Sequence, residues 1–383
     1  MKRITAIALI TLLALTVSAC TVNPPAGGDS KIPQGYVKEN GSLMFDEPAE
    51  NYAIYNYCPS IFEENGVRYA YYCSNMYNTN VKDYVAFRRG EKIDGEWYWS
   101  EKQFVLAPTE STWDSMHTCD PDVIKGEFKY NGETYNYLMT YLGCVTTNNQ
   151  CNEVGLAVAK SPEGPFIKCD EINPIVSYTY DPSRPEVFQW GYGQSSLVSV
   201  DKKGKVLLYY TQGTTTENGI RVERWDLSDL NNPVKEYSQK MFLKGIRTWD
   251  NTTTATISNA DFAYDPVGKR FFVIGDGFPF VTADEPSFVA AKSFVGFVKA
   301  STAENAVLGD IFNAYDGRSW NNVGFVSSAI SGYERNHNAC IVADEYGWLL
   351  NGNLEVAYTV AELNKPSNSL WTYRIHRYFY GKI

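Results

Sequence analysis

Tyr57-Cys58-Pro59-Ser60-Ile61 is the first of five short segments that share one pattern. In each, a polar residue opens a short apolar strand, a Gly or Asp turn follows, and an aromatic strand returns. The other four are Cys119-Asp120-Pro121-Asp122-Val123, Gly193-Gln194-Ser195-Ser196-Leu197, Asn259-Ala260-Asp261-Phe262-Ala263 and Asn336-His337-Asn338-Ala339-Cys340. Repeats of roughly 60 to 80 residues with several strands each are typical of propeller blades. The sequence therefore predicts an all-β, five-bladed β-propeller whose opening residues meet in one axial pocket, and we take these residues to be Cys58, Asp120, Gln194, Asp261 and His337.

Strand signals are dense between the openings, and helical periodicity is scarce. Residues 68–73 follow an Asn-Gly turn at 65–66, and residues 135–141 follow another at 131–132. Such turns favour hairpins between alternating apolar runs. We therefore expect at least three strands in each repeat. The alternating segment 370–380 is expected to pair with the N-terminal blade and close the ring.

The N-terminus is expected to lie outside the fold. Lys2 and Arg3 precede an apolar run at 4–16, and small residues lead to Cys20. This pattern is that of a secretory signal, and the cysteine resembles a bacterial lipobox; the alternative is an ordinary signal peptide with an incidental cysteine. We expect a signal peptide at 1–19, a lipid-anchored flexible linker at 20–38 with Cys20 lipidated, and one propeller domain at 39–383. The expected location is extracytoplasmic and membrane-anchored, as a bacterial lipoprotein.

Composition narrows the choice of partner. The formal net charge is −10, and the sequence shows no basic cluster that would bind a phosphate backbone. Nucleic acid is therefore not an expected partner. The chain has 28 Tyr, 19 Phe and 9 Trp, which suits β-strands. Exposed rings also stack on the apolar faces of sugars, although core packing accounts for most of them. A carbohydrate ligand and a monomeric protein are expected.

Eight cysteines in an oxidising compartment predict disulfides. Cys144 and Cys151 flank a polar, hairpin-like loop and are the pair that we favour. Cys58 and Cys119 both lie at blade openings and are candidates for neighbours near the axis. Connectivity cannot be read from spacing. No Cys-x-x-Cys or Cys/His pattern with zinc spacing occurs, so a structural zinc site is not expected.

One blade carries a family resemblance. Asp120-Pro121-Asp122-Val123-Ile124, residues 137–141 and the run from Gly155 to Phe166 resemble the second blade of glycoside hydrolase family 43. The Asn336-His337-Asn338 opening looks like the same family, in which a His at this place often lies near a bound cation. The resemblance covers about residues 50–380. It implies an inverting hydrolase of the β-xylosidase and arabinofuranosidase type, with three carboxyl groups at the openings of blades one, two and three.

The chain departs from that pattern at two of the three positions. The resemblance implies a general base at blade one, a carboxyl that tunes the acid at blade two, and a general acid at blade three. Asp120 matches the second, but Cys58 and Gln194 occupy the others. Gln does not titrate, and a thiolate is an unusual base for water. Asp261 and Glu186 are therefore our candidates for the missing carboxyls beside Asp120, with Glu153 and Glu334 as alternatives.

The remaining candidates are expected to bind substrate. They are Cys58, His117, Asp122, Trp190, Gln194 and His337. No cofactor is required, although His337 is a possible ligand of a Ca²⁺ ion near the axis. Three functions are compatible with the residues. One is a glycoside hydrolase acting on arabinose- or xylose-type glycans. The second is a surface glycan-binding lipoprotein that has lost catalysis, and the third is a scaffold for protein partners.

Overall fold

The computed structural model describes residues 31–45, 53–76, 80–247, 254, 256–278, 289–300, 319–365 and 367–383. The expected signal peptide, the lipidation site at Cys20 and most of the expected linker lie outside these residues. Within the described part, no helix has the length and apolar character needed to cross a membrane. In the part of the chain that the structure describes, helical structure is limited to three short pieces: α2 (Ser328–Ser331), η2 (Leu350–Gly352) and η3 (Ser367–Thr372).

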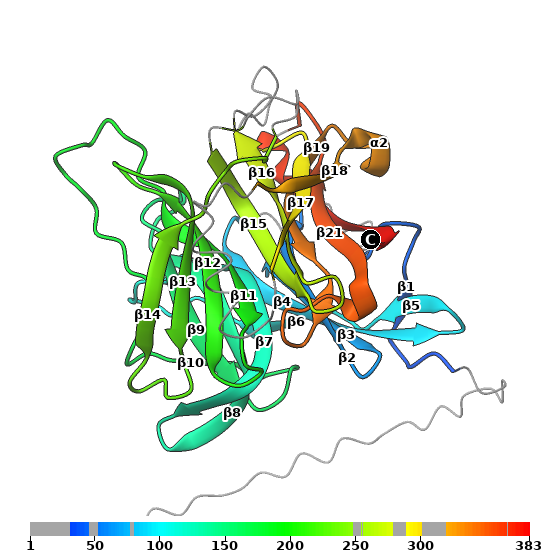
Figure 1. Ribbon diagram of the computed structural model, residues 1–383, viewed down its shortest axis with the longest axis horizontal. Coiled ribbons are helices and arrows are strands. Elements are labelled where there is room, and N and C mark those ends of the chain that lie inside the picture. The colour runs from blue at the N-terminus through cyan, green and yellow to red at the C-terminus, as the bar shows by residue number, and fades with distance from the viewer. Residues whose placement is uncertain are drawn as a thin grey trace, which may run out of the picture.

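The described strands form five sheets (Figure 1). The first contains β1 (Val37–Lys38), β5 (Glu96–Trp99), β4 (Asp83–Ile93), β3 (Val67–Asn75), β2 (Asn56–Glu64) and β20 (Ala343–Asp344), with β6 (Gln103–Leu106) paired to β4. The second contains β10 (Ile167–Lys168), β9 (Glu153–Ala159), β8 (Glu133–Cys144) and β7 (His117–Tyr130). The third contains β11 (Gly191–Ser199), β12 (Lys205–Gly213), β13 (Asn218–Asp226) and β14 (Val234–Lys240).

The last two sheets come from the C-terminal part of the chain. The fourth contains β15 (Thr256–Asp265), β16 (Arg270–Phe278), β17 (Ser293–Lys299) and β18 (Asn321–Val326). The fifth contains β19 (Arg335–Ile341), β21 (Asn353–Ala361) and β22 (Arg374–Lys382). The predicted all-β propeller is confirmed. Among the described residues, however, four sheets have the four or more strands of a complete blade, rather than the five complete blades that the repeat predicts.

The five sheets follow one another around an axis. The innermost strand of each sheet contacts the next, in the order β2, β7, β11, β15 and β19, and β19 contacts β2 again. An apolar cluster fills each space between neighbouring sheets. Between the third and fourth sheets, for example, the rings of Tyr209 and Phe262 stack with their centroids 3.8 Å apart. Burying one large side chain of this kind contributes about 1.5–3 kcal/mol.

The two ends of the domain meet at the three-stranded sheet. An N-terminal segment runs beside β22, where Met44 donates its backbone N–H to Ile375 O at 3.0 Å. Arg377 in turn donates its backbone N–H to Ser42 O at 2.9 Å. β20 also pairs in parallel with β2 of the first sheet. These contacts agree with the expectation that the C-terminal segment closes the ring.

Candidate functional site

Each innermost strand is interrupted by a bulge at the same place. Two residues leave the ladder between Tyr57 and Ser60 of β2, and the ladders of β7, β11, β15 and β19 shift in the same way. The first bulged residue has a left-handed backbone in every case, with φ of 47° at Cys58, 45° at Asp120, 50° at Gln194, 47° at Asn259 and 43° at Asn338. We call these five residues the bulge ring.

The bulge ring corrects two of the predicted openings. Cys58, Asp120 and Gln194 take the ring position in the first three sheets, as predicted. In the fourth and fifth sheets this position belongs to Asn259 and Asn338, not to the predicted Asp261 and His337. Asp261 lies two residues further along its strand, and His337 lies one residue before Asn338. The bulge is the cause. Two residues of the strand have no partner in the ladder, so the residue that takes the ring position is shifted along the strand.

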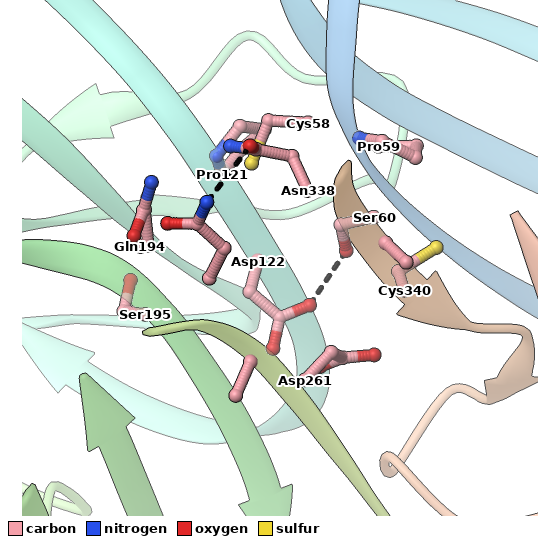
Figure 2. Close-up of a pocket in the computed structure, with 13 residues that line it drawn as sticks. Cys58, Pro59, Ser60, Pro121, Asp122, Gln194, Ser195, Asp261, Asn338 and Cys340 are labelled. Carbon is pink, nitrogen blue, oxygen red and sulfur yellow. Dashed lines mark hydrogen bonds between the residues drawn. The ribbon is translucent and has the colours of Figure 1, made fainter. Parts of the chain in front are cut away.

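A small cavity lies on the axis inside the bulge ring. Residues of all five innermost strands line it (Figure 2), which confirms that the openings converge. Its volume is about 30 Å³, room for roughly two water molecules since one needs about 10–15 Å³. Ligand pockets typically measure about 300–1,000 Å³. A sugar ring therefore does not fit inside this cavity, and a glycan would have to bind outside it, at the end formed by the bulge ring, which we call the mouth.

Asp122 and Asp261 line the cavity from two different strands (Figure 2). Asp122 accepts hydrogen bonds from the Ser60 hydroxyl at 2.6 Å and from the Leu197 backbone N–H at 2.5 Å. Asp261 accepts one from the Ile341 backbone N–H at 2.7 Å. Burial raises the pKa of Asp122 to about 7, helped by the nearby Asp261 charge, and raises the pKa of Asp261 to about 6. These bonds tie three neighbouring sheets to the two carboxyls, so both have a structural task.

Asp120 occupies the bulge ring next to Cys58 and is 4% exposed. The Cys58 thiol hydrogen-bonds to its carboxyl group. Burial raises the pKa of Asp120 to about 7, and the charge of Asp83 adds to the increase while the Cys58 bond opposes it. Burial also raises the pKa of the Cys58 thiol well above its usual range. Cys58 therefore stays protonated at neutral pH, while Asp120 is able to hold or release a proton there.

A histidine–aspartate pair lies close enough to Asp120 to act on it electrostatically. His117 Nδ1 is 2.7 Å from Asp83 Oδ2, and the Tyr55 hydroxyl donates to Asp83 Oδ1 at 2.7 Å. The Asp83 backbone N–H also points at His117 Nδ1, 3.2 Å away. These two contacts with Asp83 fix the orientation of the His117 ring.

A second polar network occupies the other side of the bulge ring. Asn259 donates Nδ2 to Asp276 Oδ2 at 2.9 Å and to Asn338 Oδ1 at 3.1 Å. Ser293 donates its hydroxyl to Asp276 Oδ1 at 2.6 Å. Burial raises the pKa of Asp276 to about 7. The amide side chains of Asn259 and Asn338 are thus held in place by a buried carboxyl group, which makes this side of the mouth a fixed set of hydrogen-bonding groups.

His337 lies behind this network and is 3% exposed. Its Nδ1 is 2.7 Å from Asn338 Oδ1, and its ring meets that of Tyr373 edge to face, with centroids 4.8 Å apart. Burial lowers its pKa to about 4, so the ring is neutral. Its Nε2 is buried and has no hydrogen-bond partner among the described residues. A nitrogen donor does not suit direct binding of Ca²⁺, which takes oxygen ligands, but a water molecule would satisfy Nε2.

Gln194 lines the axial cavity, whereas Trp190 lies beside Cys58 outside that lining. The side-chain oxygen of Gln194 is buried without a hydrogen-bond partner among the described residues. Trp190 is partly buried and packs in a small cluster with Tyr57, Cys58, Cys73, Cys119 and Leu142. Asp120, Gln194 and Trp190 thus all lie close to Cys58, through a hydrogen bond, the shared cavity and the small apolar cluster respectively.

Glu186 has the wrong surroundings for a general acid. Its side chain is 63% exposed and pairs with Arg184, with Arg184 Nε and Glu186 Oε1 2.6 Å apart. The hydrogen bond from Arg184 lowers the pKa of Glu186, whereas a general acid needs a raised one. Glu153 is also engaged, since it accepts the Tyr178 backbone N–H at 2.8 Å. The structure argues against Glu186 as the proton donor.

The cysteines pair differently from the prediction. Cys73 and Cys119 form a disulfide, whereas Cys144 and Cys151 are free. Thr146 and Gln150 close the 144–151 loop instead, through two hydrogen bonds of 2.8 and 2.9 Å. Cys58 does lie beside Cys119 near the axis, as expected. Cys73 has no motif around it, but it lies opposite Tyr57 in the β2–β3 hairpin.

Sequence reasoning missed four residues of the site: Asp83, Asn259, Asp276 and Asn338. Asn259 and Asn338 stand inside the quoted opening segments, and an Asn is one of the residues most often found at positive φ. That preference was the available signal. Asp83 and Asp276 lie on β4 and β16, away from every opening, and only the pairing of strands brings them to the axis.

Comparison with known proteins identifies the fold. No protein-family model matches the chain, and no curated protein matches it by sequence. A family 117 glycoside hydrolase of the marine bacterium Zobellia galactanivorans is 15% identical over 90% of this chain and 89% of its own, with a TM-score of 0.52. An α-L-arabinofuranosidase from Podospora anserina, solved with cellotriose, is 9% identical over 90% of this chain and 96% of its own, with a TM-score of 0.50.

A third solved structure has the same architecture. It is an exo-β-1,3-galactanase from Phanerochaete chrysosporium, bound to β-1,3-galactotriose, which is 14% identical over 90% of this chain and 63% of its own, with a TM-score of 0.52. At these identities the likeness concerns the fold. The chain therefore has the fold of the β-propeller glycoside hydrolases, to which the second-blade motif already pointed.

Proposed function

We propose that the protein is an extracytoplasmic glycoside hydrolase acting on a glycan bound at the mouth of the axial cavity. The observation that carries the proposal is the position of Asp120. Its buried carboxyl group lies in the bulge ring, bonded to Cys58 and beside the His117–Asp83 pair. Two proton-handling groups at one mouth are what glycoside hydrolysis requires, and the fold is one that hosts this chemistry.

The proposed roles follow from the surroundings of each group. Asp120 donates a proton to the leaving-group oxygen, since burial favours its protonated form near neutral pH. His117, held in orientation by Asp83, is the proposed acceptor of a proton from the attacking water. This is a different division of roles from the one that the family resemblance implies. Cys58 and Gln194 then contact the substrate without moving protons.

The proposed substrate is an oligosaccharide or polysaccharide of arabinose, xylose or galactose. The family resemblance and the names of the solved structures, an α-L-arabinofuranosidase and an exo-β-1,3-galactanase, support this class. The partly buried ring of Trp190 beside Cys58 offers a face on which a sugar can stack. Asn259, Asn338 and Gln194 offer amide groups suited to sugar hydroxyls.

The second candidate function is glycan binding without turnover. Cys58 and Gln194 favour it, because they stand where the resembling family has its base and its acid. Asp120 would then serve only as a hydrogen-bonding group, and the mouth would hold a sugar through the same amides and Trp190. Catalysis and binding make different predictions for one substitution.

The experiment compares turnover and binding of the purified protein on arabinan, xylan and galactan oligosaccharides. Hydrolysis is followed by product chromatography, and binding by calorimetry. Asp120→Asn is expected to lower kcat by at least about 100-fold while binding persists. Asp170→Asn, which changes an exposed carboxyl in the turn that follows β10, is the matched control. Binding without any turnover by the unchanged protein would reject the hydrolase and support the second candidate, and neither binding nor turnover would reject both.

Four further expectations belong to this proposal. The three-stranded sheet, with the N-terminal segment beside β22, is counted as the fifth blade. Residues 1–19 are a signal peptide, and Cys20 is lipidated and tethers the domain to a membrane. A Ca²⁺ ion near the axis would contact His337 through water. The protein is a monomer. Mass spectrometry of the mature N-terminus tests the lipid anchor, since an unmodified Cys20 would exclude it.

A further inference from the structure

Three cysteines and one aspartate meet at the mouth although they are far apart in sequence. Cys58 and Asp120 are bulge residues of the neighbouring strands β2 and β7. Cys73 lies opposite Tyr57 on β3, and Cys119 immediately precedes Asp120. The topology therefore collects four metal-ligating side chains that show no zinc spacing along the chain.

The ligand atoms of this group lie within the reach of one ion. One ligand atom each of Cys58, Cys73 and Asp120 lies within 4.8 Å of the other two. Asp120 Oδ1 is 3.5 Å from Cys73 Sγ and 3.2 Å from Cys119 Sγ. The Cys58 thiol hydrogen-bonds to the same carboxyl group. Thiolate sulfurs and a carboxylate oxygen are ligands that Zn²⁺ and other thiophilic ions accept in tetrahedral sites.

We propose that reduction of the Cys73–Cys119 disulfide opens a binding site for one thiophilic divalent cation, held by Cys58, Cys73, Cys119 and Asp120. A dithiol reductant supplies two electrons and two protons, so the S–S bond breaks, two thiols form and the dithiol closes to its own disulfide. The ion then displaces the thiol protons, and three thiolates and one carboxylate bind it. In the oxidised protein two of the three sulfurs are joined to each other, which keeps the site closed.

The surroundings support such a site. The backbone N–H of Asp120 points at Cys73 Sγ, 2.9 Å away, and the Tyr57 hydroxyl lies 3.0 Å from Cys119 Sγ. Donors of this kind around the ligands hold them in place. Cys58 is partly exposed as a residue and lines the axial cavity, which places the group at the edge of that cavity. Binding would occupy the Asp120 carboxyl and thus block the mouth, whether the mouth hydrolyses a glycan or only binds one.

The test titrates Cd²⁺, a spectroscopic probe for Zn²⁺, into the full-length protein before and after reduction with removal of the reductant. Thiolate-to-cadmium charge-transfer absorption reports the number of bound sulfurs. We expect one Cd²⁺ per chain in the reduced protein, displaced by Zn²⁺, and no such band in the oxidised protein. Cys58→Ser should lower the band by a third and the affinity by at least about 100-fold. Asp120→Asn should keep the band and lower the affinity by about tenfold or more.

Cys151→Ser is the matched control, because Cys151 is free and partly exposed but lies outside the group. It should leave both the band and the affinity unchanged. An equal band in the oxidised protein, or no effect of Cys58→Ser, would overturn the proposal. Circular dichroism of the reduced protein is measured alongside, and loss of its β signal would overturn the proposal as well, since the site requires the fold.

Discussion

Asn259 donates its backbone N–H to the Thr211 hydroxyl at 3.1 Å, from a bulge of the fourth sheet to the second strand of the third. The same relationship recurs around the axis. Cys58 donates to Thr359 Oγ1 at 3.1 Å, Asp120 to Cys73 Sγ at 2.9 Å and Asn338 to Asp276 Oδ2 at 3.4 Å. Gln194 is the fifth ring residue. Leu142 stands where the other four ring residues have their acceptor, and it packs against Gly193.

These bonds predict the effect of removing one acceptor. Thr211→Val keeps the shape of the side chain but leaves the Asn259 N–H without its partner. We expect a loss of about 1–3 kcal/mol in the free energy of unfolding, the cost of a buried unpaired donor. Urea denaturation measures it. Thr134→Val, on an exposed strand position, is the control, and an equal effect of both substitutions would show that the bond between sheets contributes nothing of its own.

The two carboxyls of the axial cavity predict a pH dependence of stability. In the unfolded chain an Asp has a pKa of about 3.9, whereas burial raises that of Asp122 to about 7 and that of Asp261 to about 6. Between the unfolded pKa of about 3.9 and the folded pKa values of about 6 and 7, the folded protein therefore binds more protons than the unfolded chain. Its free energy of unfolding falls as pH rises through this range. The denaturation midpoint should be higher at pH 5 than at pH 8.

Asp261→Asn sharpens that prediction. The substitution removes one raised carboxyl and the charge that helps to raise the pKa of Asp122. The decrease in midpoint between pH 5 and pH 8 should become smaller, but it should not vanish, because burial also raises the pKa of Asp120 and of Asp276. An unchanged or steeper decrease would show that the two cavity carboxyls do not titrate together.

The disulfide predicts which cysteines matter for stability. Cys73 and Cys119 are 46 residues apart in sequence, and a link over a loop of this length typically stabilises a protein by about 2–4 kcal/mol. The Cys73→Ser/Cys119→Ser variant should unfold at a clearly lower temperature than the unchanged protein. Cys144→Ser/Cys151→Ser should not behave like it. Peptide mapping without reductant provides the direct check, and a linked 144–151 peptide would refute the assignment.

An ion pair at the ring closure predicts a large effect of charge removal. Arg68 of β3 binds Glu355 of β21 through two hydrogen bonds of 2.8 and 2.6 Å, and the side chains are only 6% and 11% exposed. Breaking a buried pair by removing one partner costs about 3–5 kcal/mol. Glu355→Gln should therefore destabilise the protein by an amount in this range. Glu96→Gln, at the exposed Lys38–Glu96 pair, should change it by less than about 1 kcal/mol.

The sequence predicted those parts of the molecule that local pattern decides. Alternating apolar strands and Asn-Gly turns were enough to indicate the propeller and the convergence of Cys58, Asp120 and Gln194. The bulges were not visible, since an inserted residue pair leaves the apolar pattern on both sides intact. Asp261 was therefore assigned to the ring because it is a charged residue in the opening segment. Asn259, which does belong to the ring, is uncharged and was not selected.

Pairings between distant strands account for the other differences. Cys144 and Cys151 are close in sequence, but hydrogen bonds of Thr146 and Gln150 already close their loop. Cys73 reaches Cys119 only because two neighbouring sheets meet at the axis. In the same way, Asp83 acquires His117 as a partner from the following sheet. Such contacts depend on register and on the ring as a whole, which single-sequence patterns do not contain.

The left-handed backbone of the bulge ring has one more consequence. A side chain at φ near 45° is under steric strain that glycine does not feel, and Asn and Asp tolerate it better than most residues. Three of the five ring residues are Asn or Asp, and their side chains also form hydrogen bonds at the axis. A replacement in the ring therefore changes the chemistry of the mouth and the stability of the axis together, so a new activity introduced there needs a matching change in the partner of the replaced residue.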